Sequence, residues 1–374
     1  MNAYVYQSPA WPDLTWDAET VAPLLARVHF LRGRLLGQIK MLGFSQQSEA
    51  LLIALTQETR QSSAIEGEML DAAQIRSSIA RRLGINTAGL PLPSREVEGV
   101  VDMMLDATQR FDQPLTKARL CGWQTGLFPN GWSGLSRVAI GAWRTEEMRV
   151  VSGRTGHERV HYTAPAPKDV PGEMTRFLKW FNADTRTDAV LKAALAHFKF
   201  IIIHPFDDGN GRVARAISEL QLARADGIKE RFYSLSGQMM AERKMYYQTL
   251  ERTQHASGDI TEWMVWFSGC FSRTLETAGA TLSRINHKME FWSRHEQTAF
   301  NARQRIVLNR LLDGFEGKLT STKWATLAKC SPDTALRDIA ELVSMSMLQK
   351  SSSGGRNTHY GLTDDHDVMD GGFV

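Results

Sequence analysis

A short stretch near the middle of the chain, His204 to Arg215, constrains the fold more than any other part of the sequence. The segment before it carries apolar residues at helical spacing, which predicts a buried helix: Leu191, Leu195, Phe198 and Ile202. Pro205 disfavours helical backbone at the residue before it, so a loop must follow. A second run of apolar residues begins after the loop: Val213, Ile217 and Leu220. The sequence therefore predicts two buried helices joined by a tight loop.

The loop has the features of an anion site. Gly209 and Gly211 allow the backbone to turn sharply and let its N–H groups approach a ligand closely. The positive end of the second helix follows, and its first N–H groups have no partners within the helix. Arg212 and Arg215 share one helical face and add two cations. We expect this loop to bind phosphate.

Two further residues add a metal ligand and a base to the expected phosphate site. Asp208 places one carboxylate beside the expected phosphates, where Mg²⁺ is held by a protein oxygen, phosphate oxygens and water. His204 supplies a base, since an unperturbed imidazole titrates near ~6.5 and accepts a proton close to neutral pH. Taken alone, the histidine could simply end a helix, and Asp-Gly-Asn-Gly could be an ordinary turn. Their combination within one loop favours phosphate chemistry.

These residues resemble the signature of the Fic family, H-x-F-x-[DE]-G-N-G-R-x-x-R, at every defined position. The resemblance implies a protein adenylyltransferase, which moves AMP from ATP to a Ser, Thr or Tyr hydroxyl of a target protein. It implies that His204 is the base and Asp208 the Mg²⁺ ligand. It also implies a mainly α fold: a helical bundle with a β-hairpin flap, an N-terminal helical region and a C-terminal winged helix.

The same resemblance assigns the nucleotide contacts. Asn210 and the loop N–H groups would hold phosphate oxygens, Arg212 the α/β region, and Arg215 the γ-phosphate. The expected nucleotide-binding set is Phe206, Asp207, Gly209, Asn210, Gly211, Arg212, Arg215, Tyr246 and Tyr247. The two tyrosines are included because family members carry a similar residue in the wall of the nucleotide pocket. Without the resemblance they would be taken for core or rim residues.

An earlier segment, Ser62 to Gly67, follows a helix that contains Leu51, Leu52 and Leu55. Ser62 and Glu66 are one helical turn apart and share a face, and Gly67 would end the helix. From the residues alone this is an exposed helix end. The segment is similar to the family's inhibitory pattern, [ST]-x-x-x-E-[GN]. That resemblance implies that Glu66 pairs with Arg215 in place of the γ-phosphate, so that the enzyme inhibits itself.

The N-terminal part begins with a Trp- and Pro-rich arm, in which Trp11 and Trp16 either pin the arm onto a domain or form a partner-binding strip. We expect the pinning role. Two segments look like the N-terminal helical region of a subset of Fic proteins: Trp11 to Asp13 and Ser77 to Gly84.

Two β-strands are expected at residues 149–152 and 158–162, joined by a turn at 153–156. His157 and His161 fall here and are expected to be surface residues, because no carboxylate or cysteine completes a metal set. In the family, a hairpin before the motif is a flap that receives the target as an added strand. The target protein is therefore expected to dock near 149–162, and the chain could also modify itself.

The C-terminal part resembles a winged helix. Its expected elements are helices at 303–312, 321–329 and 331–342, and a hairpin of strands 348–350 and 358–362 around a loop at 351–356. The last helix has Asp333, Asp338 and Glu341 against Arg337 alone, a poor match to DNA. We expect it to contact protein, possible homodimer formation included. A DNA-associated regulator remains the alternative, as does removal of AMP from a modified target.

Length and composition set the remaining expectations. A chain of 374 residues is long enough for more than one core, and we expect domains at 1–110, 111–290 and 291–374. A net charge of +3 is too small to indicate a nucleic-acid or membrane partner. Three scattered cysteines favour neither a disulfide framework nor a zinc site. No apolar run approaches the ~18 residues of a spanning helix, so a cytoplasmic protein is expected.

Overall fold

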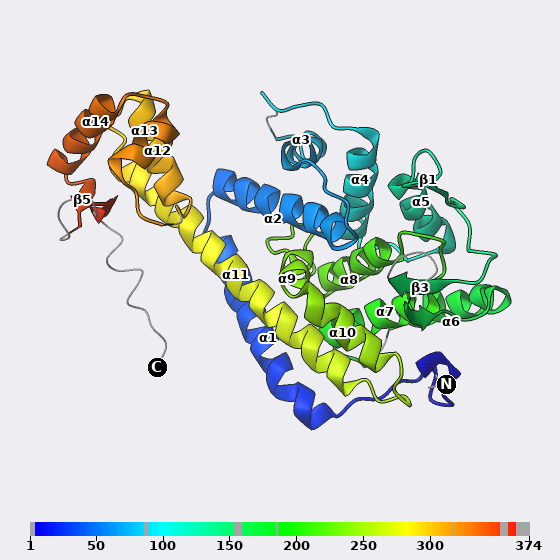
Figure 1. The fold of residues 1–374 in the computed structure, drawn as a ribbon. Coiled ribbons are helices and arrows are strands. Elements are labelled where there is room, and N and C mark those ends of the chain that lie inside the picture. The colour runs from blue at the N-terminus through cyan, green and yellow to red at the C-terminus, as the bar shows by residue number, and fades with distance from the viewer. Residues whose placement is uncertain are drawn as a thin grey trace. The chain divides into compact units, whose positions relative to one another are not determined.

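The computed structural model describes residues 4–85, 89–152, 159–184, 186–315, 317–351 and 358–363. Helices dominate these residues, and the strands within them form two-stranded antiparallel hairpins (Figure 1). The predicted mainly α fold is confirmed. The chain divides into two compact units, Met1–Gly279 and Ala280–Val374. None of the helices in the described ranges combines the length and apolar character needed to cross a membrane.

The N-terminal half of the first unit is helical. It comprises a 3₁₀ turn, Val5–Gln7, and the helices α1 (Ala18–Lys40), α2 (Phe44–Ile65), α3 (Ala72–Arg82), α4 (Arg95–Gln109) and α5 (Lys117–Leu127). Four of these helices begin at a residue whose side chain accepts a hydrogen bond from the first turn: Asp17, Asp71, Ser94 and Thr116. Such caps fix where each helix starts, because they satisfy N–H groups that the helix itself leaves unpaired.

Two hairpins and the remaining helices complete the unit. The hairpins are β1 (Trp132–Ser133) with β2 (Ser136–Arg137), and β3 (Arg149–Ser152) with β4 (Arg159–Thr163). A 3₁₀ turn, Pro167–Asp169, leads into α6 (Val170–Asn182), α7 (Ala189–Ile203), α8 (Asn210–Asp226), α9 (Leu235–Ala241), α10 (Arg243–Thr253) and α11 (Thr261–Arg294), and the last of these continues past Gly279 into the second unit. Both expected strands of the second hairpin are present. The turn predicted at 153–156, and His157, lie outside the described residues.

The core of this unit lies around α7 and α8, which pack along each other as the sequence predicts. Residues of α4, α5 and α6 join them in one apolar cluster, which includes Val100, Leu120, Phe177, Phe200 and Ile217. On α7 the Ala194 carbonyl accepts a hydrogen bond from Trp263 Nε1 of α11, at 2.8 Å. Both helices of the motif are thus held by buried contacts, and the loop between them is anchored at each end.

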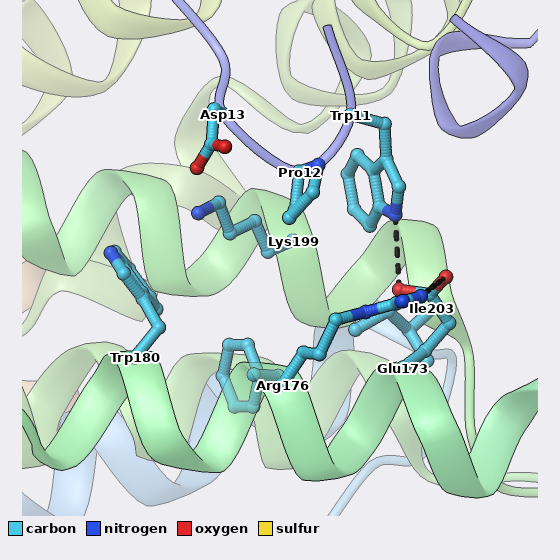
Figure 2. A pocket seen from close by; sticks show the side chains of 9 residues that line it. Trp11, Pro12, Asp13, Glu173, Arg176, Trp180, Lys199 and Ile203 are labelled. Carbon is cyan, nitrogen blue, oxygen red and sulfur yellow. Dashed lines mark hydrogen bonds and ion pairs between the residues drawn. The ribbon is translucent and has the colours of Figure 1, made fainter. Parts of the chain in front are cut away.

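The N-terminal arm is fixed to α6 and α7 through Trp11 (Figure 2). Trp11 Nε1 donates to Glu173 Oε2 at 3.0 Å. Nearby, Lys199 Nζ lies 3.9 Å from the centroid of the Trp180 ring, and residues of the arm and of both helices line a small cavity of about 50 Å³. For Trp11, the pinning role expected from the sequence is confirmed.

The second unit contains α12 (Ala302–Leu312), α13 (Ser321–Ala328), α14 (Pro332–Ser344) and a hairpin of β5 (Leu348–Lys350) with β6 (Tyr360–Leu362). The order of elements agrees with the sequence prediction, except that the loop residues 352–357 lie outside the described part. Ser331 caps α14 by accepting from Thr334 N at 3.2 Å. Trp324 is fully buried in the small core. Asp338 pairs with Arg303 at 2.8 Å inside this unit.

Candidate active site

A cavity of about 580 Å³ opens at the motif loop, within the size range of small-molecule sites. His204, Asp208 and the Gly209 to Gly211 turn line one side of it. The hairpin β3–β4 and α10 contribute the other walls, with residues that include Val150, Tyr162, Tyr247 and Gln254. The structure therefore brings the expected base, metal ligand and phosphate loop to one cavity that the hairpin also faces.

His204 caps the C-terminus of α7 in the left-handed region, with φ of 49°. Its Nδ1 lies 3.1 Å from the Ile201 carbonyl oxygen. A carbonyl only accepts, so this bond favours the tautomer with the proton on Nδ1 and leaves the Nε2 lone pair available. Burial lowers the pKa of His204 to about 4, well below the unperturbed value assumed from the sequence. The imidazole is consequently neutral at neutral pH and able to accept a proton.

Two residues that sequence reasoning missed hold the His204 end of the loop. Arg144, which is 2% exposed, donates from Nε to the His204 carbonyl at 2.8 Å, and its backbone N–H donates to the Pro205 carbonyl at 2.9 Å. The Tyr162 hydroxyl on β4 donates to the Ile202 carbonyl at 2.5 Å. An isolated arginine in an irregular segment carries no periodic signal, so nothing local identified Arg144.

Three residues of the predicted nucleotide-binding set give the loop its shape. Phe206 is fully buried, with its ring centroid 5.0 Å from that of Trp143. The Asn210 side chain bonds both backbone groups of Phe206, at 3.0 Å and 2.8 Å. Asp207 accepts from the Ala139 N–H at 2.9 Å. Their polar groups are engaged with protein, and the first turn of α8, which no side chain caps, offers its backbone N–H groups instead.

Asp208 is placed as a single-carboxylate metal ligand requires. Its Oδ1 accepts from the Gly209 N–H at 2.6 Å and its Oδ2 from the Ser133 hydroxyl at 2.5 Å. Both partners are neutral hydrogen-bond donors. The described residues contain no group of three or more side chains that could hold a metal ion. A lone carboxylate suits Mg²⁺, which keeps waters and binds substrate phosphates.

Arg215 is 1% exposed and bonded to the end of α2. Its Nε donates to Ser62 Oγ at 2.9 Å and its Nη2 to the Ser62 carbonyl at 2.7 Å. The same Nη2 lies 2.8 Å from Glu66 Oε1. Among the described residues its Nη1, although buried, has no acceptor. The structure thus places Ser62 and Glu66 against the arginine that the resemblance assigns to the γ-phosphate.

Arg212 has a carboxylate partner of its own. Its Nη1 forms an ion pair with Glu68, and its guanidinium carbon lies 5.0 Å from the centroid of the Phe128 ring. Its Nε is buried and has no acceptor within the described part of the chain. Buried donors without acceptors are rare in folded proteins. One such donor on each motif arginine fits a site built for phosphate oxygens.

The turn at Gly67 explains how one helix end reaches both arginines. Gly67 has φ of 89°, its N–H donates to the Ala64 carbonyl at 3.0 Å, and the Glu68 N–H donates to the Ser63 carbonyl at 3.1 Å. This is a Schellman cap, which requires a residue that tolerates left-handed backbone. Gly and Asn tolerate it best, which gives a physical reason for the last position of the [ST]-x-x-x-E-[GN] pattern.

The motif also requires glycine at position 211, because Glu66 approaches the backbone closely there. A Cβ placed on Gly211 would lie 2.0 Å from Glu66 Oε1. Any side chain at this position would therefore displace Glu66 or the loop.

The two tyrosines of α10 differ. Tyr246 is 1% exposed, and its hydroxyl lies 2.9 Å from His197 Nε2. Burial lowers the pKa of His197 to about 3, so this histidine is neutral. Tyr247 is 39% exposed, and its hydroxyl lies 3.5 Å from Glu66 Oε2. Tyr247 is therefore the better placed of the two for contact with a nucleotide.

The fold and site together place a histidine, a carboxylate and a glycine turn at a helix N-terminus around one cavity of a helical domain. Residues 114–222 match the model of the Fic/DOC family, and residues 4–85 match a domain of unknown function, DUF4172. The part of the chain that carries the motif, residues 114–222, is therefore similar to the Fic/DOC family.

Two proteins named protein adenylyltransferase Fic illustrate the similarity. The protein from Culex quinquefasciatus is 32% identical over 134 residues, which are 35% of this chain and 25% of that protein. The protein from Drosophila yakuba is 26% identical over 234 residues, 60% of this chain and 41% of that protein. The chain thus matches between a quarter and two fifths of the length of these relatives.

A crystal structure of a Fic family protein from Desulfovibrio desulfuricans G20 has the same fold. The TM-score is 0.55 at 20% identity, over 96% of this chain and 99% of that one.

Proposed function

We propose that this chain is a protein adenylyltransferase that transfers AMP from Mg-ATP to a Ser, Thr or Tyr hydroxyl of a target protein. The observation that carries the proposal is the shared cavity: His204, Asp208 and the N-terminus of α8 all face it, and so does the hairpin β3–β4. The name of the curated relatives supports the same activity.

The proposed reaction follows from this arrangement. His204 Nε2 takes the proton of the target hydroxyl as its oxygen attacks the α-phosphorus of ATP. The bond from that phosphorus to the bridging oxygen breaks, and pyrophosphate leaves. The α8 N-terminus and Arg212 and Arg215 orient the phosphates, so positioning and charge neutralisation supply most of the rate. When bound at Asp208, Mg²⁺ would neutralise developing negative charge on the leaving phosphates.

Target docking is proposed at the hairpin. Strands β3 and β4 form a two-stranded sheet, so each has a free edge within the described residues. Three of their apolar residues are exposed: Val150, Val151 and Val160. An extended target segment can add to such an edge as a further strand. A segment of a second copy of the chain would give self-modification.

The site is proposed to inhibit itself through Glu66. Its carboxylate lies 2.8 Å from Arg215 Nη2, where the resemblance expects the γ-phosphate. A charge-assisted pair in a partly dry site is strong, and ATP must displace it to bind productively.

For the Ala280–Val374 unit we propose contact with protein, a second copy of the chain included, rather than with DNA. Arg337 is the single basic residue of α14. Strong DNA binding depends on several phosphate contacts from Lys and Arg, which this helix does not supply.

Parallel incubation with α-labelled and γ-labelled ATP tests the function, because the label retained on protein identifies the group transferred. We expect the α label alone to be retained, and to be lost in His204→Ala. Retention of the γ label would indicate phosphoryl transfer. Retention of neither label would contradict both AMP transfer and phosphoryl transfer. Release of AMP from a pre-labelled target would indicate the reverse reaction.

A further inference from the structure

Glu68 is the ion-pair partner of Arg212. Arg212 is 2% exposed and lies against the Phe128 ring, and its Nη1 pairs with the Glu68 carboxylate. Among the described residues, Glu68 is the carboxylate within ion-pair distance of Arg212. Burial raises the pKa of the Glu68 carboxyl, although the charge of Arg212 opposes this, so the group is partly removed from water.

The cap that places Glu66 also places Glu68. Gly67 turns the chain in left-handed backbone, and the Glu68 N–H is fixed on the Ser63 carbonyl at 3.1 Å. One helix end thereby presents two carboxylates to the two guanidinium groups of the motif. Arg212 and Arg215, which the proposed function assigns to the phosphates of ATP, are both paired with carboxylates of the protein in this structure.

We propose that Glu68 is a second residue that competes with the nucleotide, by occupying Arg212, so that the α/β-phosphate region cannot bind until Glu68 is displaced. This rests on the proposed function insofar as the ligand is Mg-ATP. It adds a separate control point, because Glu66 acts on Arg215 and Glu68 acts on Arg212.

Glu68 has space to leave the arginine. Its side chain is 40% exposed, against 31% for Glu66. It also borders a cavity of about 350 Å³, lined by Phe128, Trp132 and Ser133 among others. Rotation of the Glu68 side chain into this cavity frees Arg212 without unwinding α2. Glu66 borders the other cavity, of about 580 Å³, and its Oε1 lies close against Gly211, so the two carboxylates would leave the arginines towards different cavities.

Nucleotide binding without chemistry tests this directly. Affinities for Mg-ATP and Mg-ADP are measured by titration calorimetry in a His204→Ala background, alone and with Glu68→Gln or Glu66→Gln. ADP has the α- and β-phosphates but lacks the γ-phosphate. We therefore expect Glu68→Gln to tighten both nucleotides, by roughly three- to tenfold for a partly exposed ion pair. Glu66→Gln should tighten ATP more than ADP.

Glu49→Gln is the matched control. Glu49 lies on the same helix and pairs with Arg76 at 2.6 Å, far along the chain from the cap. The Glu49→Gln variant loses one charge and one ion pair, as Glu68→Gln does, and its affinities for Mg-ATP and Mg-ADP should stay at the parental values. Equal ADP affinity in the parent and in Glu68→Gln, with ATP binding intact, would overturn the role of Glu68 and leave the nucleotide site standing. Failure of every variant to bind either nucleotide would overturn the proposed function and this inference with it.

Discussion

The two ends of the motif loop are held in different ways. At the His204 end the partners are backbone carbonyls, which accept from Arg144, from Tyr162 and from His204 itself. At the arginine end the partners are carboxylates, Glu66 on Arg215 and Glu68 on Arg212. The His204 end is braced, and no hydrogen bond to its Nε2 is found among the described residues, whereas both arginines at the other end are paired with carboxylates. On the proposed function, control would act on binding of the nucleotide tail and leave the base in place.

The largest expected effect is at the base end. His204→Ala should lower AMP transfer by about 10²- to 10⁴-fold, the usual contribution of a general base. The fold should persist, because the residue caps α7 and is not part of mid-core packing. Initial AMP incorporation and a thermal melt measure the two quantities.

His29→Ala is the control for this variant. His29 lies on α1, outside the lining of the cavity, and its Nε2 lies 2.8 Å from Asp188 Oδ2. Transfer should change little in this variant. Wild-type transfer by His204→Ala would show that another group takes the proton.

Asp208→Ala is expected to lower transfer by roughly a hundredfold, because one direct carboxylate positions Mg²⁺ against the phosphates. Modest extra Mg²⁺ should not restore the rate. The measurement is initial rate against Mg²⁺ concentration, with Asp102→Ala as control because its carboxylate pairs with Arg82 and does not line the cavity. A Mg²⁺ dependence equal to that of the wild type would rule out the ligand role.

Glu66→Gly should raise transfer, which tests the occupied end of the loop. The variant frees Arg215 for the γ-phosphate, and one charge-assisted pair is worth ~1.5 to 3 kcal/mol, or roughly ten- to a hundredfold in rate. Self-modification gives the simplest assay, at equal protein and ATP. Arg215→Ala in the same background should cancel the gain.

Two outcomes would contradict this reading. Equal rates in wild type and Glu66→Gly would make Ser62 to Gly67 an ordinary helix end. A drop would mean that Glu66 takes part in the chemistry itself.

The sequence predicted the parts of this site that depend on local pattern. Apolar spacing located α7 and α8, Gly67 marked the end of α2, and the turn-rich link at 153–156 located both strands of the second hairpin. Each of these signals extends over a few neighbouring residues, where periodicity and turn preference are strong.

Contacts between distant segments were not predictable in the same way. Arg144 reaches His204 across the loop, and Ser133 reaches Asp208 from the first hairpin. Asn210 belongs to the recognised motif, yet its amide holds the Phe206 backbone. Glu68 stood beside the inhibitory pattern, but its partner became visible only once the helix cap was placed. The pKa of His204 belongs to this group as well, because it depends on the burial that the whole site imposes.

That pKa leads to the smallest expected effect, on the acid side of the pH profile. The base must be neutral to accept a proton, and burial lowers the pKa of His204 to about 4, so protonation should reduce kcat/KM only well below pH 5. At pH 5.5 a pKa near 4 leaves about 97% of the imidazole neutral, whereas an unperturbed value near 6.5 would leave about 9%.

Measured in Glu66→Gly, where rates are high enough, kcat/KM should fall less than about twofold between pH 7 and 5.5. Removing Glu66 moves the pKa further down, since its negative charge raises it. Mg-ATP affinity at each pH separates protonation of the nucleotide from that of the base. A fall of about eightfold in kcat/KM at constant affinity, as an unperturbed pKa near 6.5 gives, would show that His204 is not desolvated in the working enzyme.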